Sequence, residues 1–577
     1  MSAGALFSVK NSFTAGELSP QMLGRADLRA YEMGASELTN VYVSPTGGLA
    51  RRPGLRLIAE AEGSGGRLAE YADGAGGAYL LHFGHLRVDA YDAAGDCLAT
   101  LASPWPAEAL PLLSWAQADD GLVVAHSDYP MRRISRAAGG SWSLALWEFS
   151  QTLGTPDQPY ANFHRGQVRI MASAATGAIT LTATAAVFSA AYIGLCLKIH
   201  GGIVQISQIL SPTAAYADVL LALSAVGLTP DWGEPAFSTV RGWPAAVAAH
   251  QSRFVIGGSR GMPSHLWLSR TGQPRNFNVG QGLDDEAIDF SLAAGNAGAV
   301  CAVASGRYLQ VFTTEAEYMV CGEPLTPSAI QVRRQTAVGS VASRRIPPRD
   351  IDGATVFVGA GGRELREFLF ADTEQAYQAA NLSMMSGHML DAPVDQEYDS
   401  RRRLLYVINA GGEMAVLTNY RTEQITAWTR WTTDGQFLAA ASVGGLVYAL
   451  VAREGSLFIE RFDDSLGADC TGGEGEGLPY AHIVTPLPPS SMAGQVRAAR
   501  LVRASFRVVG TASLRVDTGT GLRQALRGDL DSPQTVDAEV RSLGWRRGLD
   551  QPLWRIWGDE PSPFVLVSVS SDIRTAG

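Results

Sequence analysis

The sequence predicts an all-β chain with a β-propeller core, an inserted small β-domain and a C-terminal β-domain. Short apolar runs alternate with glycine-containing turns, and glycine contributes 63 of the 577 residues. Units of strand, glycine turn and strand recur roughly every 45 to 50 residues, which is the spacing of four-stranded propeller blades. A set of separate β-sandwiches is the alternative, because the same strand lengths allow it.

Residues 1–60 are expected to form an extended N-terminal arm. The segment is dense in turn formers, such as those in Gly16-Glu17-Leu18-Ser19-Pro20, and poor in apolar periodicity. Such an arm gains order by lying on something else, so we expect it to pack on a neighbouring subunit and not to close its own core. From the residue types alone, an ordinary N-terminal lead-in is the alternative.

Residues 61–159 are expected to contribute the first propeller strands. Apolar runs at 78–83, 86–91 and 97–101 are joined by short turns, and a further strand is predicted at 121–126. Consecutive short strands joined by tight turns are typical of a β-meander, from which propeller blades are built.

Residues 160–235 are expected to form a small β-domain inserted between blades. This segment is rich in Ala and Thr, and no charged residue occurs between Arg169 and Lys198. The uncharged stretch is long enough to span a bilayer, but the alternation at 179–182 has the period of a strand. We therefore predict a buried β-hairpin region here and no membrane span.

Residues 236–477 are expected to hold the main propeller blades. The predicted pairs of strands are 254–258 with 266–270, 309–313 with 317–320, 356–358 with 365–369, 404–408 with 414–417, and 446–450 with 457–460. The number of blades stays open, because the blade that closes the ring can combine N-terminal and later strands.

Residues 478–577 are expected to form a separate C-terminal β-domain. A proline-rich stretch at 486–489 predicts a linker, and strands are predicted at 502–507 and 564–569. Arginine outnumbers the acidic residues in this part, whereas the rest of the chain is acidic.

Several motifs follow one another along most of the chain. They are Phe13, the run Gly16-Glu17-Leu18-Ser19-Pro20, Arg25, Asp27, Tyr31, Asn40 and residues 48–54, followed by 241–244, 253–258, 266–270, 312–318 and 361–367. In their order and spacing they resemble the tail nozzle proteins of short-tailed bacteriophages, also called tail tubular or stabilization proteins. The matching patches span residues 13–463, and residues 478–577 match less well.

The resemblance implies a structural virion protein and no enzyme. It implies a homo-oligomeric ring, expected to be a hexamer, that lies below the portal and adaptor of the phage tail. Genomic DNA would leave through this ring without sequence-specific binding. The resemblance also implies assembly in the cytoplasm of the host bacterium and contacts with other tail proteins, and it leaves contact with the host surface open. The assembly interface is expected to include Phe13, Glu17, Pro20, Arg25, Asp27, Arg51, Arg52 and Pro53.

The charge of the chain fits a channel better than a nucleic-acid-binding protein. Its net charge is −10, whereas binding of nucleic acid requires clustered Lys and Arg that neutralise phosphates. A conduit through which DNA slides is better lined by acidic and small polar side chains, which do not hold phosphate. We expect such a lining in the passage of the ring.

One motif formally matches that of a hydrolase. Gly257-Gly258-Ser259-Arg260-Gly261 satisfies the GxSxG pattern and follows a predicted strand. A nucleophile elbow requires a helix directly after the serine, whereas the following residues lead into another strand. We predict a blade turn here, and we expect no catalytic residue and no cofactor in the chain.

Metal ligation and disulfide bonding are not expected either. His82 and His85 could ligate a metal, but no third ligand with suitable spacing is near. The acidic run 284–286 could bind a cation, but a solvated loop is the favoured interpretation. The five cysteines are scattered without metal-ligand spacing and are expected to be reduced thiols made in a cytoplasm. We also expect no secretion signal.

The run of three arginines at 401–403 has two interpretations. It could bind phosphate, but ion pairs with Glu397 and Asp399 at the start of a strand are favoured.

A phage surface propeller that binds or cleaves host glycans is the alternative function. A glycosidase needs two carboxylates that face each other across a cleft, from about 5 to 10 Å apart. Scattered Asp and Glu residues do not reveal such a pair in a sequence, so turnover of host polysaccharide is the discriminating observation.

Overall fold

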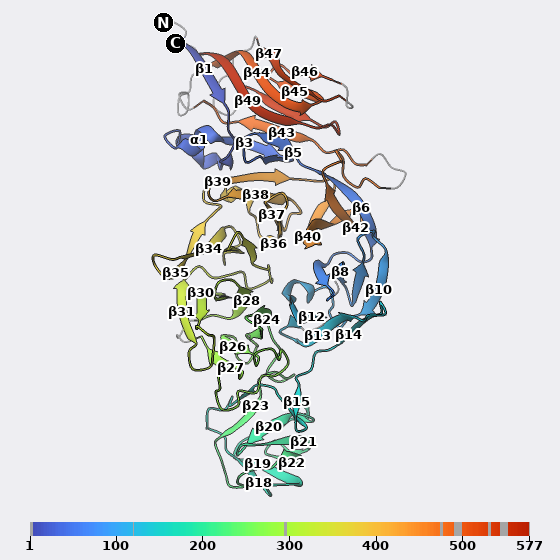
Figure 1. Cartoon of the computed structure of the whole chain (residues 1–577), viewed down its shortest axis with the longest axis vertical. Helices are drawn as coiled ribbons and strands as arrows, with labels where there is room; N and C mark the ends of the chain where they lie inside the picture. The colour runs from blue at the N-terminus through green and yellow to red at the C-terminus, as the bar shows by residue number, and fades with distance from the viewer. Residues whose placement is uncertain are drawn as a thin grey trace.

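The computed structural model describes residues 4–74, 76–118, 121–292, 297–472, 477–489, 499–528, 532–542 and 552–575. The chain is all-β, as predicted. Figure 1 shows three parts in a row: a domain that contains both termini, a central ring of blades, and a small domain at the far end.

The central ring is a β-propeller, and the described residues form seven four-stranded blades. Before the small domain come β7–β10 (Arg67–Ala72, Ala78–Gly84, Arg87–Tyr91, Cys97–Ala102) and β11–β14 (Ser114–Ala118, Gly121–His126, Tyr129–Arg136, Trp142–Leu146). After it come β24–β27 (Ala246–His250, Arg253–Gly257, His265–Leu268, Ile288–Ser291), β28–β31 (Val300–Ser305, Leu309–Thr313, Glu317–Cys321, Gln331–Thr336), β32–β35 (Arg349–Ile351, Ala354–Val358, Leu365–Ala371, Ala376–Asn381) and β36–β39 (Pro393–Asp399, Leu404–Asn409, Met414–Tyr420, Ile425–Trp431). The last blade consists of β40–β42 (Gln436–Val443, Leu446–Arg453, Ser456–Asp463) and β6 (Gly54–Ala61).

The last blade closes the ring with a strand from the N-terminal segment. β6 pairs antiparallel with β42, in a register that places Leu55 opposite Phe462 and Ala61 opposite Leu457. β40, the first strand of this blade, in turn contacts β7 of the first blade. The closing blade therefore combines strands from both ends of the propeller, and closure leaves no open edge between the first and last blades.

Both termini build one sandwich of two sheets, here called the terminal domain. One sheet contains β1 (Gly4–Lys10), β4 (Val41–Val43), β5 (Leu49–Arg51), β44 (Ala499–Thr511), β47 (Gln534–Arg541) and β49 (Val565–Thr575). The other contains β2 (Gly16–Glu17), β3 (Gly34–Thr39), β43 (His482–Pro486), β45 (Ser513–Asp517), β46 (Leu522–Arg527) and β48 (Arg555–Gly558). The core between them combines N-terminal residues such as Phe13 and Leu38 with C-terminal residues such as Phe506 and Ile556.

Two expectations about the termini were therefore wrong. Residues 1–60 are not an arm outside the core, because β1 pairs with β49, β3 with β43 and β5 with β49. Residues 478–577 are not a separate domain, because their strands need these N-terminal partners to complete both sheets. The apolar N-terminal residues are too widely spaced to show a local period, but they fill a core built mostly by the other end of the chain.

The terminal domain continues one blade of the propeller. β3 meets the outer strand β39 in a parallel bridge between Thr39 and Arg430, so the blade β36–β39 and the second terminal sheet form one ten-stranded sheet. This continuity fixes the terminal domain to the edge of the ring, as Figure 1 shows.

The small domain is an insertion between the second and third blades. Its seven-stranded sheet comprises β17 (Tyr160–Ala161), β18 (Ile170–Ala172), β19 (Ala178–Ala183), β20 (Cys196–Ile199), β21 (Gly202–Ser211), β22 (Ala214–Leu221) and β23 (Trp232–Pro235), with its own apolar core. The uncharged stretch after Arg169 supplies β18 and β19 to this sheet. The described part of the chain contains no helix with the length and apolar content of a transmembrane span.

Candidate assembly surface

Five of the eight residues expected at an assembly interface are buried within their own chain. These residues are Phe13, Glu17, Arg51, Arg52 and Pro53. They lie where the terminal domain meets the propeller, so their side chains serve that junction and are not available to a neighbouring subunit.

Arg52 is the centre of the junction. Its guanidinium forms a bidentate ion pair with Asp469, with 2.8 Å between Nη1 and Oδ1, and both side chains are almost fully buried. It also donates to Asn40 Oδ1 and to the carbonyl oxygens of Pro53 and Thr432, at 3.0, 2.9 and 2.9 Å. These bonds occupy all five N–H groups of the guanidinium, which is the condition under which a buried arginine is tolerated.

Glu17 connects the N-terminal segment to the blade β36–β39. One carboxylate oxygen accepts from the N–H of Leu38 at 2.8 Å, and the other lies 2.9 Å from Nε2 of His388. Ser386 donates to the carbonyl oxygen of Glu17 at 2.6 Å. β2 pairs with β3, and Ser386 and His388 belong to the short helix η4 (Gly387–Met389) and its N-cap, so these contacts fix the entry of the chain into the terminal domain.

The other three predicted residues are exposed. Pro20 begins the short helix η1 (Pro20–Gly24), and Arg25 and Asp27 follow it and form an ion pair at 2.9 Å. The carbonyl oxygen of Met385 accepts from the N–H of Ser19 at 2.8 Å. Met384, the residue before it, is 80% exposed. This corner of the molecule is free to contact a partner.

A further candidate surface, which sequence reasoning missed, is the outer face of β1. Within the described residues β1 pairs only with β49, so it is an edge strand of its sheet. Leu6 packs toward the core, whereas Phe7 and Val9 on the opposite face are 66% and 53% exposed. An edge strand with exposed apolar side chains is a template for contact with another chain. The alternation of Phe7 and Val9 with Ser8 and Lys10 was the available sequence signal.

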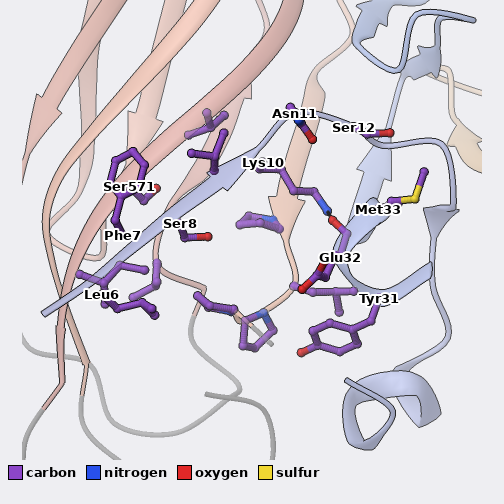
Figure 2. Close-up of a pocket in the computed structure, with 18 of the residues that line it drawn as sticks. Leu6, Phe7, Ser8, Lys10, Asn11, Ser12, Tyr31, Glu32, Met33 and Ser571 are labelled. Atoms are coloured by element: carbon purple, nitrogen blue, oxygen red, sulfur yellow. Dashed lines mark hydrogen bonds between the residues drawn. The ribbon is translucent and has the colours of Figure 1, made fainter. Parts of the chain in front are cut away.

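The inner side of β1 borders a cavity of about 540 Å³. Its walls come from β1, the segment containing α1 (Arg29–Met33), the prolines at 486–489 and the end of β49. Figure 2 shows the side chain of Lys10 reaching from β1 toward Glu32. Lys10 donates to the carbonyl oxygens of Glu32 and Gly34, and burial lowers the pKa of Lys10 to about 7, opposed in part by the Glu32 carboxylate. β1 is thus anchored at Lys10, while Phe7 and Val9 stay exposed.

The serine of the GxSxG motif lies in a turn between two strands, as expected. β25 ends at Gly257 and β26 begins at His265. Ser259 is buried, and its Oγ accepts from the N–H of Met262 at 3.1 Å. Among the described residues, no His, Asp or Glu side chain hydrogen-bonds to this hydroxyl. The geometry is that of a blade turn and lacks the helix of a nucleophile elbow.

Substitutions in this turn are expected to affect folding and not chemistry. Gly258 has φ +61°, and a Cβ there would lie 2.9 Å from the carbonyl oxygen of Pro263, so Gly258→Val should lower the unfolding free energy by about 1–3 kcal/mol. Ser259→Ala should cost only about 1 kcal/mol, through the lost hydrogen bond. Urea denaturation measures both. A loss of unfolding free energy in Ser259→Ala as large as that in Gly258→Val would contradict this description of the turn.

The candidate metal ligands do not converge. His85 accepts from the N–H of Ala107 at 3.1 Å through Nδ1, while His82 is buried with its Nδ1 3.7 Å from Asp89. No group of three or more His, Cys, Asp or Glu side chains with metal-binding geometry occurs in the described residues. All five cysteines are free thiols.

The acidic loop at 284–286 is held by its own chain. Asp285 pairs with Nε of Arg270 at 3.0 Å, and Glu286 accepts from the N–H groups of Gln281 and Leu283 at 2.7 and 2.8 Å. These contacts give the carboxylates a structural role. Asp284 and Asp285 are exposed, as expected for a solvated loop, whereas Glu286 is buried.

The run of three arginines forms ion pairs, in part as predicted. Arg402 pairs with Asp399 at 2.7 Å and with Asp464 at 2.6 Å, and Arg403 pairs with Asp352. The expected pairing with Glu397 was wrong, because that carboxylate bonds Arg349.

The motif around Arg241 fixes the inserted domain to the propeller. Arg241 forms a bidentate ion pair with the buried Glu234 of β23, at 2.8 and 2.9 Å. Tyr192, from the short helix η3 (Ala190–Tyr192), donates to the same carboxylate at 3.1 Å. Another motif arginine, Arg253, is buried and donates to the carbonyl oxygens of Ser269 and Glu286, both at 2.7 Å. These motif residues therefore stabilise the fold.

No protein-family model matches the sequence, and no curated protein matches it. Among solved structures, selenomethionine-substituted virginiamycin B lyase from Staphylococcus aureus aligns over 71% of this chain and 99% of its own, with 10% identity and a TM-score of 0.35. The WD40 repeats of RRP9 align over 72% of this chain and 100% of their own, with 8% identity and a TM-score of 0.35. Similarity at this level concerns the fold alone.

Proposed function

We propose that this chain is a structural, non-enzymatic subunit of the tail nozzle of a short-tailed bacteriophage. In this proposal it assembles in the host cytoplasm into a hexameric ring below the portal and adaptor, and genomic DNA leaves through the ring. The order of the motifs along residues 13–463 carries the proposal. The contacts of Glu17 and Arg52 support the proposal, because both motif residues stabilise the junction between the terminal domain and the propeller.

In this proposal the assembly contact lies on the exposed part of the terminal domain. The outer face of β1 offers Phe7 and Val9, and the corner near Arg25 and Met384 offers a second exposed site. An edge strand can extend its sheet into a neighbour by main-chain hydrogen bonds, and exposed apolar side chains add buried area. In a closed ring the same contact recurs in every subunit.

Charge placed on β1 is expected to disrupt this assembly without unfolding the chain. The double variant Phe7→Asp and Val9→Asp should be monomeric under conditions in which the unchanged protein forms rings, because a charge buried in an apolar contact is strongly unfavourable. Light scattering coupled to size-exclusion chromatography measures the mass, and thermal unfolding checks the fold.

Leu153 offers a matched control for these substitutions. It is 88% exposed and lies in the turn between β15 (Gln151–Thr152) and β16 (Thr155–Pro156), so Leu153→Asp should leave the ring intact. Rings of unchanged mass in the Phe7→Asp and Val9→Asp variant would exclude β1 as the contact. Turnover of host polysaccharide by the purified protein would instead favour the glycan-cleaving alternative.

A further inference from the structure

The centre of the propeller holds a partly open cavity that neither the assembly contacts nor the motifs explain. Its volume is about 320 Å³. The residues that line it come from the first strands of five blades, β7, β11, β24, β28 and β32, and from the segment 345–348. First strands of neighbouring blades contact one another at β11 and β24, at β24 and β28, at β36 and β40, and at β40 and β7, so the first strands face the centre of the propeller and the cavity lies at its axis.

Arg67 is a buried arginine in the wall of this cavity. It is 1% exposed, and its guanidinium lies over the ring of Trp115 at 4.6 Å. Nη1 donates to the carbonyl oxygen of Leu113 at 3.2 Å, and Nη2 lies 3.6 Å from Asp395. Nε has no hydrogen-bond partner in the structure. Burial lowers the pKa of Arg67 to about 10, opposed in part by Asp395.

Within the described residues, neither Arg345, which lines the cavity, nor its chain neighbour Arg344, which does not, has a carboxylate partner. Arg345 donates to the carbonyl oxygens of Ala342 and Ala245, at 3.1 and 3.5 Å. Arg344 lies next to it, and its Nε has no hydrogen-bond partner. Within the described ranges no carboxylate lies within ion-pair distance of either guanidinium. Burial lowers the pKa of both groups, and at Arg344 the Asp395 carboxylate opposes this shift in part.

The acidic groups nearby do not balance these charges. Arg349 also lines the cavity, but it pairs with Glu397 at 2.7 Å. Asp395 also accepts from the N–H of Gln396 at 3.1 Å and from that of Ala440 at 3.2 Å. Asp350 lines the cavity but is exposed, and it accepts from the N–H of Gly353 in a turn. The buried part therefore holds more guanidinium groups than carboxylates.

We propose that the axial cavity binds a small oxyanion, a phosphate or carboxylate group, between Arg67 and Arg345. Guanidinium groups bind such anions through paired N–H donors, and the attraction is strong where water is excluded. A volume near 300 Å³ is enough for a small organic acid as well as for phosphate. The bound anion would compensate the positive charge of the arginines that the nearby carboxylates do not balance. This inference does not depend on the assembly of subunits into a hexamer.

Isothermal titration of the full chain with inorganic phosphate, and separately with citrate, tests this site. We expect saturable binding of at least one of them, and a melting temperature that rises with its concentration at constant ionic strength. Arg345→Gln should weaken binding by about ten-fold to a hundred-fold. Arg507→Gln is the control, because Arg507 is exposed and pairs with Asp537 in the terminal domain.

Comparison of the two variants distinguishes binding in the axial cavity from a general effect of salt on the protein. Binding that is lost in Arg345→Gln and kept in Arg507→Gln supports the axial site. Phosphate in preference to citrate indicates a phosphate ligand, and the reverse indicates a carboxylate. The absence of saturable binding to either anion in the unchanged protein would overturn the proposal, as would equal binding in both variants.

Discussion

Deletion of residues 1–54 is expected to abolish folding of the terminal domain. The deletion removes β1–β5 and the buried side chains of Phe13, Leu38 and Leu49, so β43 and β49 lose their N-terminal partner strands and the core between the two sheets loses its N-terminal part. It also removes Arg52 and leaves Asp469 as a buried, unpaired carboxylate beside the propeller. Limited proteolysis and near-ultraviolet circular dichroism of the purified chain measure the loss.

A shorter deletion provides the control for this experiment. Removal of residues 1–10 takes away only β1, an edge strand, and should leave a folded chain with weakened assembly. If the chain without residues 1–54 instead remains compact and resists protease, the N-terminal segment is dispensable for the fold, as an arm would be.

Arg52→Ala is expected to be the most destabilising single substitution in the N-terminal motif. It breaks a fully buried, bidentate ion pair and leaves the Asp469 carboxylate without its partner, which costs about 3–5 kcal/mol of unfolding free energy. Arg52→Lys should recover only part of this loss, because an ammonium group cannot form the same paired bonds. Denaturant titration followed by tryptophan fluorescence measures the differences.

Arg25→Ala is the matched control within the same motif. Arg25 also forms a close ion pair, with Asp27, but both side chains are exposed, so the denaturation midpoint should not move. Equal midpoints for Arg52→Ala and Arg25→Ala would contradict the structural role assigned to Arg52.

The blades could be predicted because their information is local. In units such as Val356–Val358 with Leu365–Leu369, two apolar runs flank a glycine turn, and the structure pairs them as β33 and β34. A hairpin of this kind is specified by neighbouring residues, and its repetition predicts the propeller. The expected insertion at 160–235 also rested on a local signal, its uncharged Ala- and Thr-rich composition.

The terminal domain could not be predicted, because its contacts join the two ends of the chain. Arg52 and Asp469 are 417 residues apart, and Arg555 donates to Glu37 across 518 residues. A short strand such as β5 carries too few residues for a period, and nothing in its sequence indicates that it pairs with β49 at the other end of the chain. The sequence shows turn-forming residues around such short strands, and for this reason residues 1–60 were expected to form an extended arm.

The arginines of the axial cavity were also missed for this reason. Arg67 lies in β7 and Arg345 in the segment between β31 and β32, and only closure of the propeller by β6 and β42 brings these distant segments around one axis. In the sequence each is a single arginine among many. A charged residue can be recognised as buried and unpaired only when the structure shows its exposure and its partners.

Electron microscopy of the purified chain at high concentration tests the proposed function most directly. The proposed function predicts closed rings of six subunits, with the outer face of β1 in the contact between neighbours. The passage should be lined by acidic and small polar side chains. A protein that remains monomeric at every concentration, both alone and with the adaptor and portal, would contradict the proposed function, and so would a ring whose passage is lined mainly by arginine.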